Sequence, residues 1–278
     1  MFGERAHWAD KAFWWVAPVI ILASAGGGLY YYFHSKKAPE ANPPPVAATP
    51  PPQAAQSAEP AIKHPVPQSA LSPGEDNTPL PGMDASDAPL SEALGKVFGG
   101  EALQKRLIAD GLVRRIVVTV DNLPRQKLAV EKRPLQPLEG QTVVSTEGDL
   151  VTLSEANYAR YAPLVRLVAG ADTQQVAQLY FRYYPLFQQA YEDLGYPGQY
   201  FNDRLVEAID SLLAAPQPAG RIQLVQPRVF YEFADPKLEA RPAGQKLMIR
   251  MGSENAAVIK GKLQELRKAV TTGRDPPQ

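Results

Sequence analysis

The sequence contains no cysteine, and its three histidines, His7, His34 and His64, all lie near its N-terminus. Without cysteine the chain can form no disulfide, no thiolate zinc site, no iron–sulfur cluster and no cysteine nucleophile. The globular part predicted below, residues 90–270, also lacks histidine, which excludes Ser-His and Cys-His catalysis and histidine-ligated zinc or haem within it. Phosphate-binding and dinucleotide-binding glycine motifs are absent as well, so we expect no cofactor.

An excess of charge of either sign is also lacking, since 29 basic residues balance 29 acidic residues. A neutral chain gives no electrostatic reason to bind nucleic acid, and we expect no such partner. The acidic residues show no spacing typical of a metal site such as an EF-hand loop, so we expect no bound metal.

Residues 12–33 contain no charged side chain at all. As a helix these 22 residues span about 33 Å, against a hydrocarbon core of about 30 Å. Aromatic residues gather at both ends of the stretch, as they do at the two interfaces of a membrane. We therefore predict a transmembrane helix at 12–33, preceded by a short tail at 1–11.

Two alternatives to an anchor follow from the same residues. Ala23-Ser24-Ala25 fits a signal-peptide cleavage site, but cleavage there would leave the apolar residues 26–33 exposed, which favours an uncleaved anchor. A buried core helix fits less well because the stretch has no polar face. Ala23 and Gly27 have the spacing of a helix-dimer contact, which permits a homodimer, although small residues facing lipid are the simpler explanation.

The basic residues do not orient the anchor, because two lie before the span and two lie shortly after it. A very short N-terminal tail, a long linker and a distal domain favour a C-terminal domain in the periplasm of a bacterium, with the anchor in the inner membrane. A domain on the cytoplasmic side remains an open alternative.

Residues 34–89 form a proline-rich and alanine-rich stretch, and 14 of the 28 prolines fall between Pro39 and Pro89. Such a composition buries too little apolar surface to offset the entropy of ordering, so we predict a disordered linker. The triprolines could also bind a proline-recognising domain, but no basic residue flanks them as a docking pair, which favours a spacer.

Residues 90–270 predict a mainly α domain with a small β-hairpin at 142–153 and extended segments, followed by a frayed tail at 271–278. The strongest helical pattern is 172–194, which contains Pro185 within its apolar stripe. Residues 112–123 are also expected to be helical, with Asp121 on the polar face. Asn202 has the right chemistry to cap a further helix.

Aromatic residues are concentrated between Tyr158 and Phe201, where 11 of 44 residues are Tyr or Phe. Their helical spacing favours a tyrosine-rich core, while a stacking platform for glycan or protein is the functional alternative. The loop at 195–202 is the better site candidate because loops expose aromatic side chains for recognition. The candidate binding residues, in this stretch and in a later motif, are Asn157, Arg160, Tyr161, Tyr184, Tyr196, Tyr200, Asn202, Arg250 and Asn255.

A hydrolase acting on glycan would need only a pair of carboxylates. The nearest acids to the aromatic stretch are Glu155, Glu192 and Asp193. Each of them also has an ordinary explanation, as a helix cap or as part of a solvated helix face. We therefore expect no catalytic residue, and an enzyme is the less favoured alternative.

Several motifs occur in order along the chain: NYARY at 157–161, YPLFQQAY at 184–191, LGYP at 194–197, FADP at 233–236 and KLMIRMGSEN at 246–255, with Asp121-Asn122-Leu123 upstream. In these the chain resembles domain-of-unknown-function family 3014, a bacterial family of anchored proteins with a proline-rich linker. The resemblance covers about residues 80–270. It implies domain limits and a bacterial source, and it supplies no activity and no catalytic residue.

Together these observations predict a single-pass membrane protein whose helical domain is a non-catalytic binding or scaffold module of the bacterial cell envelope. Its expected partners are the membrane and an envelope protein or peptidoglycan. A carboxylate-dependent envelope glycan hydrolase and a cytoplasm-facing adaptor are the alternatives.

Overall fold

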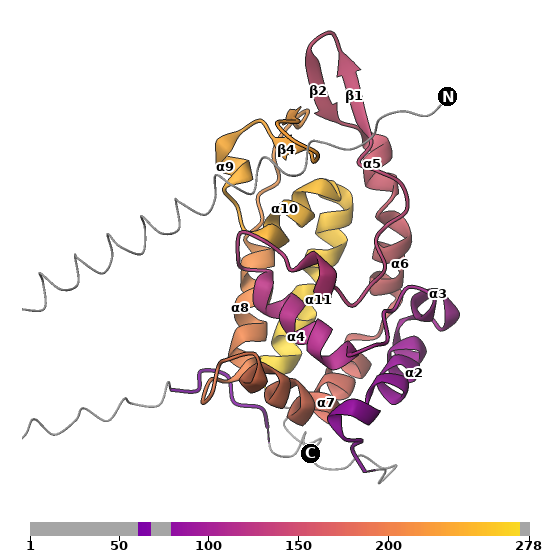
Figure 1. Cartoon of the computed structure of the whole chain (residues 1–278), viewed down its shortest axis with the longest axis vertical. Coiled ribbons are helices and arrows are strands. Elements are labelled where there is room, and N and C mark those ends of the chain that lie inside the picture. Colours follow the sequence, from indigo (N-terminus) through magenta and orange to yellow (C-terminus); the bar gives the residue numbers. More distant parts are fainter. Residues whose placement is uncertain (1–60, 68–78, 273–278) are drawn as a thin grey trace, which may run out of the picture. The chain divides into compact units, whose positions relative to one another are not determined.

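Four helices form the centre of the computed structural model, which describes residues 61–67 and 79–272 (Figure 1). Helix α4 packs against α7 and α8, and α11 packs against α7 and α8 as well, so the four helices share one apolar core. Their bounds are Leu112–Asn122 for α4, Thr173–Asp193 for α7, Phe201–Leu213 for α8 and Ser253–Thr271 for α11.

Shorter helices surround this centre, and α2 and α6 lie along one side of it (Figure 1). The surrounding helices are α2 (Asp87–Phe98), α3 (Glu101–Gln104), α5 (Glu155–Ala159), α6 (Ala162–Gly170), α9 (Pro236–Glu239) and α10 (Ala243–Arg250), with single 3₁₀ turns η2 (Met83–Ala85) and η3 (Val130–Lys132). The prediction of a mainly α domain is therefore confirmed.

The strands form two short antiparallel pairs. β1 (Val144–Glu147) and β2 (Leu150–Leu153) make the hairpin expected at 142–153, which projects from the helices in Figure 1. β3 (Leu224–Val225) pairs with β4 (Glu232–Phe233), and the amide of Leu153 donates to the carbonyl of Ile222 beside it. This bond fastens the base of the hairpin to the second pair.

The boundaries of α7 follow from its sequence. The Asp172 carboxylate caps the helix by accepting from the amides of Gln174 and Gln175, as the predicted start at 172 requires. The helix continues through Pro185 to Asp193. The prediction that Pro185 lies within the apolar stripe is wrong, because Pro185 is exposed. Phe181 and Tyr184 are buried instead, since α4, α8 and α11 all contact this helix.

The predicted role of Asn202 as a helix cap is wrong. Helix α8 begins at Phe201, two residues earlier than a cap at Asn202 requires, and its N-cap Tyr200 makes no side-chain capping bond. Asn202 lies within the helix and is fully buried. Its amide nitrogen donates to the carbonyls of His64 and Val270, which are far from it in sequence, so local capping chemistry does not determine its place.

Part of the predicted linker at 34–89 packs against the domain instead of forming a free tether. The Val66 side chain is buried in the same core as α7 and α8. Helix α2 also begins at Asp87, and Leu90 is buried. The packing of the described residues therefore starts before residue 90, and His64 belongs to the folded part.

The predicted segments at 1–11 and 12–33 lie outside the described residues, as do most of the predicted linker and 273–278. Within 61–67 and 79–272, no helix has both the length and the apolar character needed to span a bilayer. The predicted frayed tail begins too early, because Thr271 still belongs to α11.

Candidate functional site

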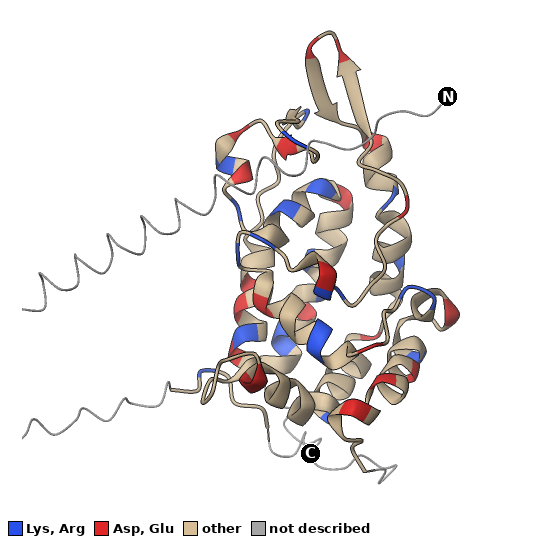
Figure 2. Ribbon diagram, viewed as in Figure 1, with Lys and Arg blue, Asp and Glu red and all other residues tan. Residues whose placement is uncertain are grey.

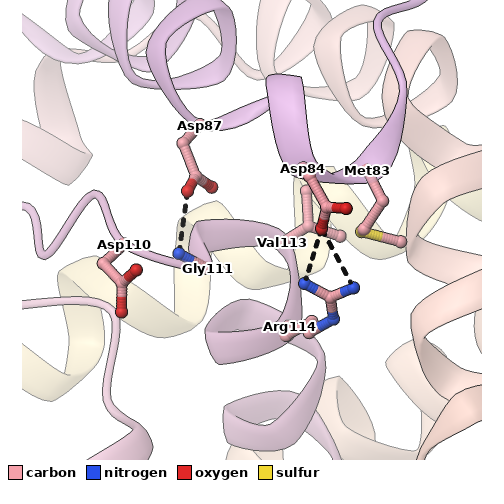
Figure 3. A pocket seen from close by; sticks show the side chains of 7 residues that line it. All are labelled: Met83, Asp84, Asp87, Asp110, Gly111, Val113 and Arg114. Atoms are coloured by element: carbon pink, nitrogen blue, oxygen red, sulfur yellow. Dashed lines mark hydrogen bonds and ion pairs between the residues drawn. The ribbon is translucent and has the colours of Figure 1, made fainter.

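One hollow, of about 220 Å³, lies between η2, α2 and the N-terminus of α4 (Figure 3). Its acidic side chains are used by the fold. The Asp87 carboxylate accepts from the amides of Gly111 and Leu112, each at 2.8 Å, and so satisfies the start of α4. Asp84 forms an ion pair with Arg114 at 3.3 Å. The hollow is therefore a junction between helices, in which Asp84 and Asp87 already have partners within the chain and are not free to bind a ligand.

A larger cleft, of about 480 Å³, lies along α8 beside the C-terminal end of α4, and we call it the α4–α8 cleft. It is lined by both signs of charge and by tyrosines, and Figure 2 shows basic and acidic residues interspersed along the same helices. Its polar lining consists of Lys63, His64, Asp121, Arg125, Tyr191, Tyr196, Gln199, Tyr200, Asp203, Arg204, Glu207 and Asp210.

Asp121 lies at the base of this cleft, where it is 3% exposed. Its carboxylate lies 3.0 Å from the guanidinium of Arg125 and 3.0 Å from that of Arg204. The Tyr196 hydroxyl donates to the same carboxylate at 3.5 Å and accepts from Arg125. Two arginines and a tyrosine are thus held by one buried acid, which fixes their positions at the cleft wall.

The tyrosines of the cleft are positioned by the turn between α7 and α8. The Gln188 side chain of α7 donates to the carbonyl of Gln199 and accepts from the amide of Phe201, so it fastens the α8 end of this turn to α7. Tyr196 stacks on Tyr191 with ring centroids 4.6 Å apart. The predicted site loop at 195–202 is therefore a fixed rim of the cleft.

Charge and burial set the ionisation of these groups. Burial acts to lower the pKa of Arg125, but its hydrogen bonds and the charges of Asp121 and Tyr196 raise that pKa overall, so the guanidinium remains charged. Burial, followed by the hydrogen bond with Tyr200, raises the pKa of Tyr184 far above its usual range. Tyr184 therefore remains neutral at the pH values of the cell.

The structure divides the nine predicted site residues into two groups. Tyr196 and Tyr200 line the α4–α8 cleft, while Tyr184 and Asn202 are buried behind it. The other five lie elsewhere, around α5 and α10, and are Asn157, Arg160, Tyr161, Arg250 and Asn255.

The polar groups of this second set fasten the fold. Asn157 is 1% exposed, and its side chain accepts from the Val143 amide and donates to the Arg250 carbonyl. Arg160 donates to the carbonyls of Glu139 and Gly140.

The remaining members behave in the same way. Arg250 donates to the Tyr231 carbonyl and lies 4.9 Å from the centre of the Phe233 ring, and Asn255 donates to the carbonyl of Tyr158. Tyr161 is half-buried and packs against the apolar residues around Met248. The side-chain donors of these residues thus bond to main-chain carbonyls, and Arg160 also donates to the side-chain oxygen of Asn157. These residues therefore position loops rather than form a second open site.

The three candidate acids lie outside the cleft lining. Glu155 stands in the first turn of α5, Glu192 accepts a hydrogen bond from Gln188, and Asp193 is exposed at the end of α7. Among residues 61–67 and 79–272, no group of three or more acidic or histidine side chains is placed to hold a metal ion.

The sequence did not predict the central role of Asp121, Arg125 and Arg204. Asp121 was expected on the polar face of its helix because its neighbours in the helical pattern are polar, but the face it occupies is covered by α8 and by the Arg204 side chain. The one signal that could have identified it was its place in the Asp121-Asn122-Leu123 motif.

Comparison with known proteins identifies a family and no activity. The model of the family described as protein of unknown function (DUF3014) matches residues 112–267, and the chain belongs to this family. No curated protein matches the chain. No solved structure matches it either.

Proposed function

We propose that this member of the DUF3014 family is a non-catalytic binding or scaffold module of the bacterial cell envelope. In this proposal residues 12–33 anchor the chain in the inner membrane, and the helical domain lies on the periplasmic side. The domain binds its partner, an envelope protein or peptidoglycan, through the α4–α8 cleft. The observation that carries the proposal is the cleft itself, with its buried Asp121 and the arginines and tyrosines arranged around it.

The lining of the cleft suits a polar partner with apolar portions. Arg125 and Tyr196 stand at the wall with fixed orientations, so little side-chain entropy is lost when a ligand contacts them. Tyrosine and arginine are also the residue types that most often supply binding energy at interfaces. Carboxylates such as Glu207 lie close by and would accept hydrogen bonds from amides or sugar hydroxyls.

The carboxylates of the cleft support binding over acid–base catalysis, because each already has a partner within the chain. Asp121 is paired with Arg125 and Arg204, and Glu207 is paired with Arg204 at 2.6 Å. Asp203 accepts from main-chain amides, and Asp210 pairs with Arg267 at 2.6 Å. A general acid or base must instead direct its proton or lone pair toward substrate.

Site-specific photo-crosslinking in the full-length chain tests the proposal. A photoreactive residue at Gln199, on the exposed rim of the cleft, should form a discrete adduct with a protein or with peptidoglycan fragments. The same residue at Gln174, exposed in the first turn of α7 and outside the cleft lining, should form none. Arg125→Ala should reduce the adduct at least tenfold, whereas Arg182→Ala, on the exposed face of α7, should leave it unchanged. Equal adducts at both positions would overturn the cleft as the binding site.

Fusion of alkaline phosphatase and of a fluorescent protein to the C-terminus tests the location. Phosphatase activity without fluorescence is the expected result. Fluorescence without phosphatase activity would replace the envelope proposal with a cytoplasm-facing adaptor. Release of soluble sugar from purified peptidoglycan by the full-length protein would favour the hydrolase alternative.

A further inference from the structure

Residues 61–67, which we call the strap, lie across the N-terminal end of α8 without forming a helix or a strand. The amides of Lys63 and His64 donate to the Asp203 carboxylate at 3.0 and 2.7 Å. The His64 carbonyl accepts from Asn202, and the Val66 amide donates to the Tyr200 hydroxyl at 3.0 Å. Two residues of α8, Asn202 and Asp203, and the N-cap residue Tyr200 thus bind the main chain of the strap.

The surface that receives the strap is fixed by the rest of the domain. Asn202 is fully buried, and its side chain is also held by the Val270 carbonyl and by the Tyr180 hydroxyl, at 3.1 and 2.9 Å. The Tyr200 ring contacts Tyr184, with ring centroids 5.7 Å apart. We call Tyr200, Asn202 and Asp203 the seat. Two of its residues, Tyr200 and Asn202, therefore have partners that hold them independently of the strap, whereas the Asp203 carboxylate is bonded by the strap amides.

The pattern of these contacts selects a particular kind of peptide. The seat bonds the amides of residues 63, 64 and 66 and leaves positions 65 and 67 without a donor to satisfy. Both of those positions are proline, which has no N–H to offer. Between them the Val66 side chain enters the apolar core and is only 6% exposed. The seat thus recognises main-chain groups together with one apolar side chain flanked by prolines, as in other modes of extended-peptide recognition.

The strap itself is held by few contacts. Val66 is its one buried side chain, while Ala61, Lys63 and Pro65 are exposed and Ile62 is 54% exposed. A segment with one buried side chain and a few hydrogen bonds can leave its seat without unfolding the helices beneath it.

We infer that the seat is a binding site for extended peptides that carry a branched aliphatic residue between two prolines, and that the strap is its resident ligand. A partner segment of the same chemistry displaces the strap. This inference rests on the proposed function, because Tyr200 and Asp203 belong both to the seat and to the α4–α8 cleft. Displacement would also remove Lys63 and His64 from the cleft wall, so that partner binding and cleft shape are coupled.

Amide hydrogen exchange of the full-length protein tests, without any substitution, whether a peptide can displace the strap. The strap amides should be protected in the protein alone. A synthetic peptide with the sequence of residues 61–67, added at about 1 mM to match the typical effective concentration of a tethered segment, should lower that protection. Protection of α11 should not change. A peptide with aspartate in place of the valine should have no effect. Unchanged strap protection at saturating peptide would show that the strap is a permanent part of the fold and would overturn the inference.

A binding assay with the full-length chain gives a second readout. Val66→Asp should release the strap, and the variant should then bind the labelled peptide at least tenfold more tightly than the native chain does. Adding Asp203→Ala to it should abolish binding, whereas adding Arg125→Ala should not. If Val66→Asp fails to fold, the exchange experiment on the native chain decides alone. Dimers of the native chain that the peptide dissociates would mean that the displacing strap comes from a second copy.

These results separate the two proposals. Loss of the Gln199 adduct in Arg125→Ala with no peptide exchange would support the cleft and overturn the seat as an exchangeable site. Peptide exchange with no specific adduct would support the seat and overturn the cleft.

Discussion

At Asp121 a carboxylate that is almost completely buried lies between the guanidinium groups of Arg125 and Arg204, one from the turn after its own helix and one from α8. Arg204 is itself mostly buried, with 14% of its side chain exposed. A buried charge is tolerated only when it is paired and hydrogen-bonded. The three residues therefore depend on one another, and a change at one of them reaches both helices.

Asp121→Asn should destabilise the protein by roughly 2–3 kcal/mol, because it leaves the buried Arg204 without its main counter-charge. The loss should fall short of the largest known cases, since Glu207 still pairs with Arg204. Urea unfolding followed by circular dichroism measures the effect. Asp110→Asn is the matched control, because the side chain of Asp110 is 98% exposed in its pair with Arg115 and its loss should cost well under 1 kcal/mol. Equal losses in the two variants would contradict the importance of the buried pair.

Gly252 is constrained both by its backbone and by its neighbour. Its φ of +85° is one that residues with a side chain rarely adopt, and a Cβ there would lie 2.7 Å from the Tyr158 ring. Gly252→Ala should therefore lower the free energy of unfolding by about 2–4 kcal/mol. Gly111→Ala isolates the backbone effect, because Gly111 has φ +64° with open space around it, and should cost about 1 kcal/mol. Equal costs would show that Tyr158 moves aside freely.

At the scale of helices and strands, the elements set by local chemistry were predictable and those set by distant partners were not. The spacing of apolar residues predicts α4 and α7, and the hairpin predicted at 142–153 is formed by strands that are adjacent in sequence. The strap has a proline-rich sequence and depends on partners more than 130 residues away, at Tyr200 and Asp203. The same reason explains Asn202, whose acceptors lie in the strap and in α11.

The candidate site was predictable to the same extent. Tyr196 and Tyr200 could be identified because they lie in a short aromatic loop after a strongly predicted helix. Arg160 and Arg250 were selected for their motifs, but their donors face main-chain carbonyls of segments far from them in sequence. No local pattern distinguishes an arginine that binds a ligand from one that holds a loop.

Pro185 tests how far packing constrains α7. It lies on the exposed face of the helix interior, where proline removes the hydrogen bond to the Phe181 carbonyl. Pro185→Ala should stabilise the protein by about 1–2 kcal/mol. Alanine is much more favourable than proline inside a helix, but part of this gain is lost because the unfolded chain becomes more flexible without the proline.

Pro163→Ala provides the control, because Pro163 stands in the first turn of α6, where a missing N–H costs nothing, and no gain is expected there. Thermal unfolding compares the two variants. Destabilisation by Pro185→Ala would mean that the proline shapes the helix for its partners.

The pair Glu239–Lys246 joins α9 to α10 and makes stability depend on pH. Burial acts to raise the pKa of Glu239, but the bonds from Lys246 and the Phe233 amide, with the nearby positive charges, lower it below its ordinary value of 4.5. Its contribution to stability is therefore fully present above pH 4.5 and is lost as the pH falls through the lower pKa of the folded state.

Urea unfolding between pH 6 and 3 should show a smaller acid-side loss of stability in Lys246→Met than in the native protein. Lys246→Arg keeps the positive charge, so the stability of this variant should fall on acidification almost as much as that of the native protein. Identical profiles for Lys246→Met and the native protein would contradict this role of the pair.

At the scale of the whole molecule, the folded unit extends beyond the residues that the family model matches. Residues 112–267 contain α4, α7, α8 and most of α11. Outside that range, however, Leu90 and Val270 are almost fully buried in the same core, and Asp87 caps α4. The described residues all belong to one compact unit spanning Ser57–Gln278. The match thus marks the centre of the fold and leaves out part of its core and the strap.

A fragment limited to 112–267 should therefore fail to unfold cooperatively, whereas a fragment of 57–278 should unfold in one transition. The shorter fragment loses Val66, Leu90, Leu103 and Val270, each of them less than 8% exposed. Full burial of one such side chain contributes about 1.5–3 kcal/mol, and four of them are comparable with the whole stability of a domain, about 5–15 kcal/mol.

Urea unfolding of both fragments by circular dichroism and by tyrosine fluorescence measures cooperativity. Coincident, steep transitions in the 112–267 fragment would contradict the expectation, and would show that α4, α7, α8 and α11 form a sufficient core without the segments that cover them.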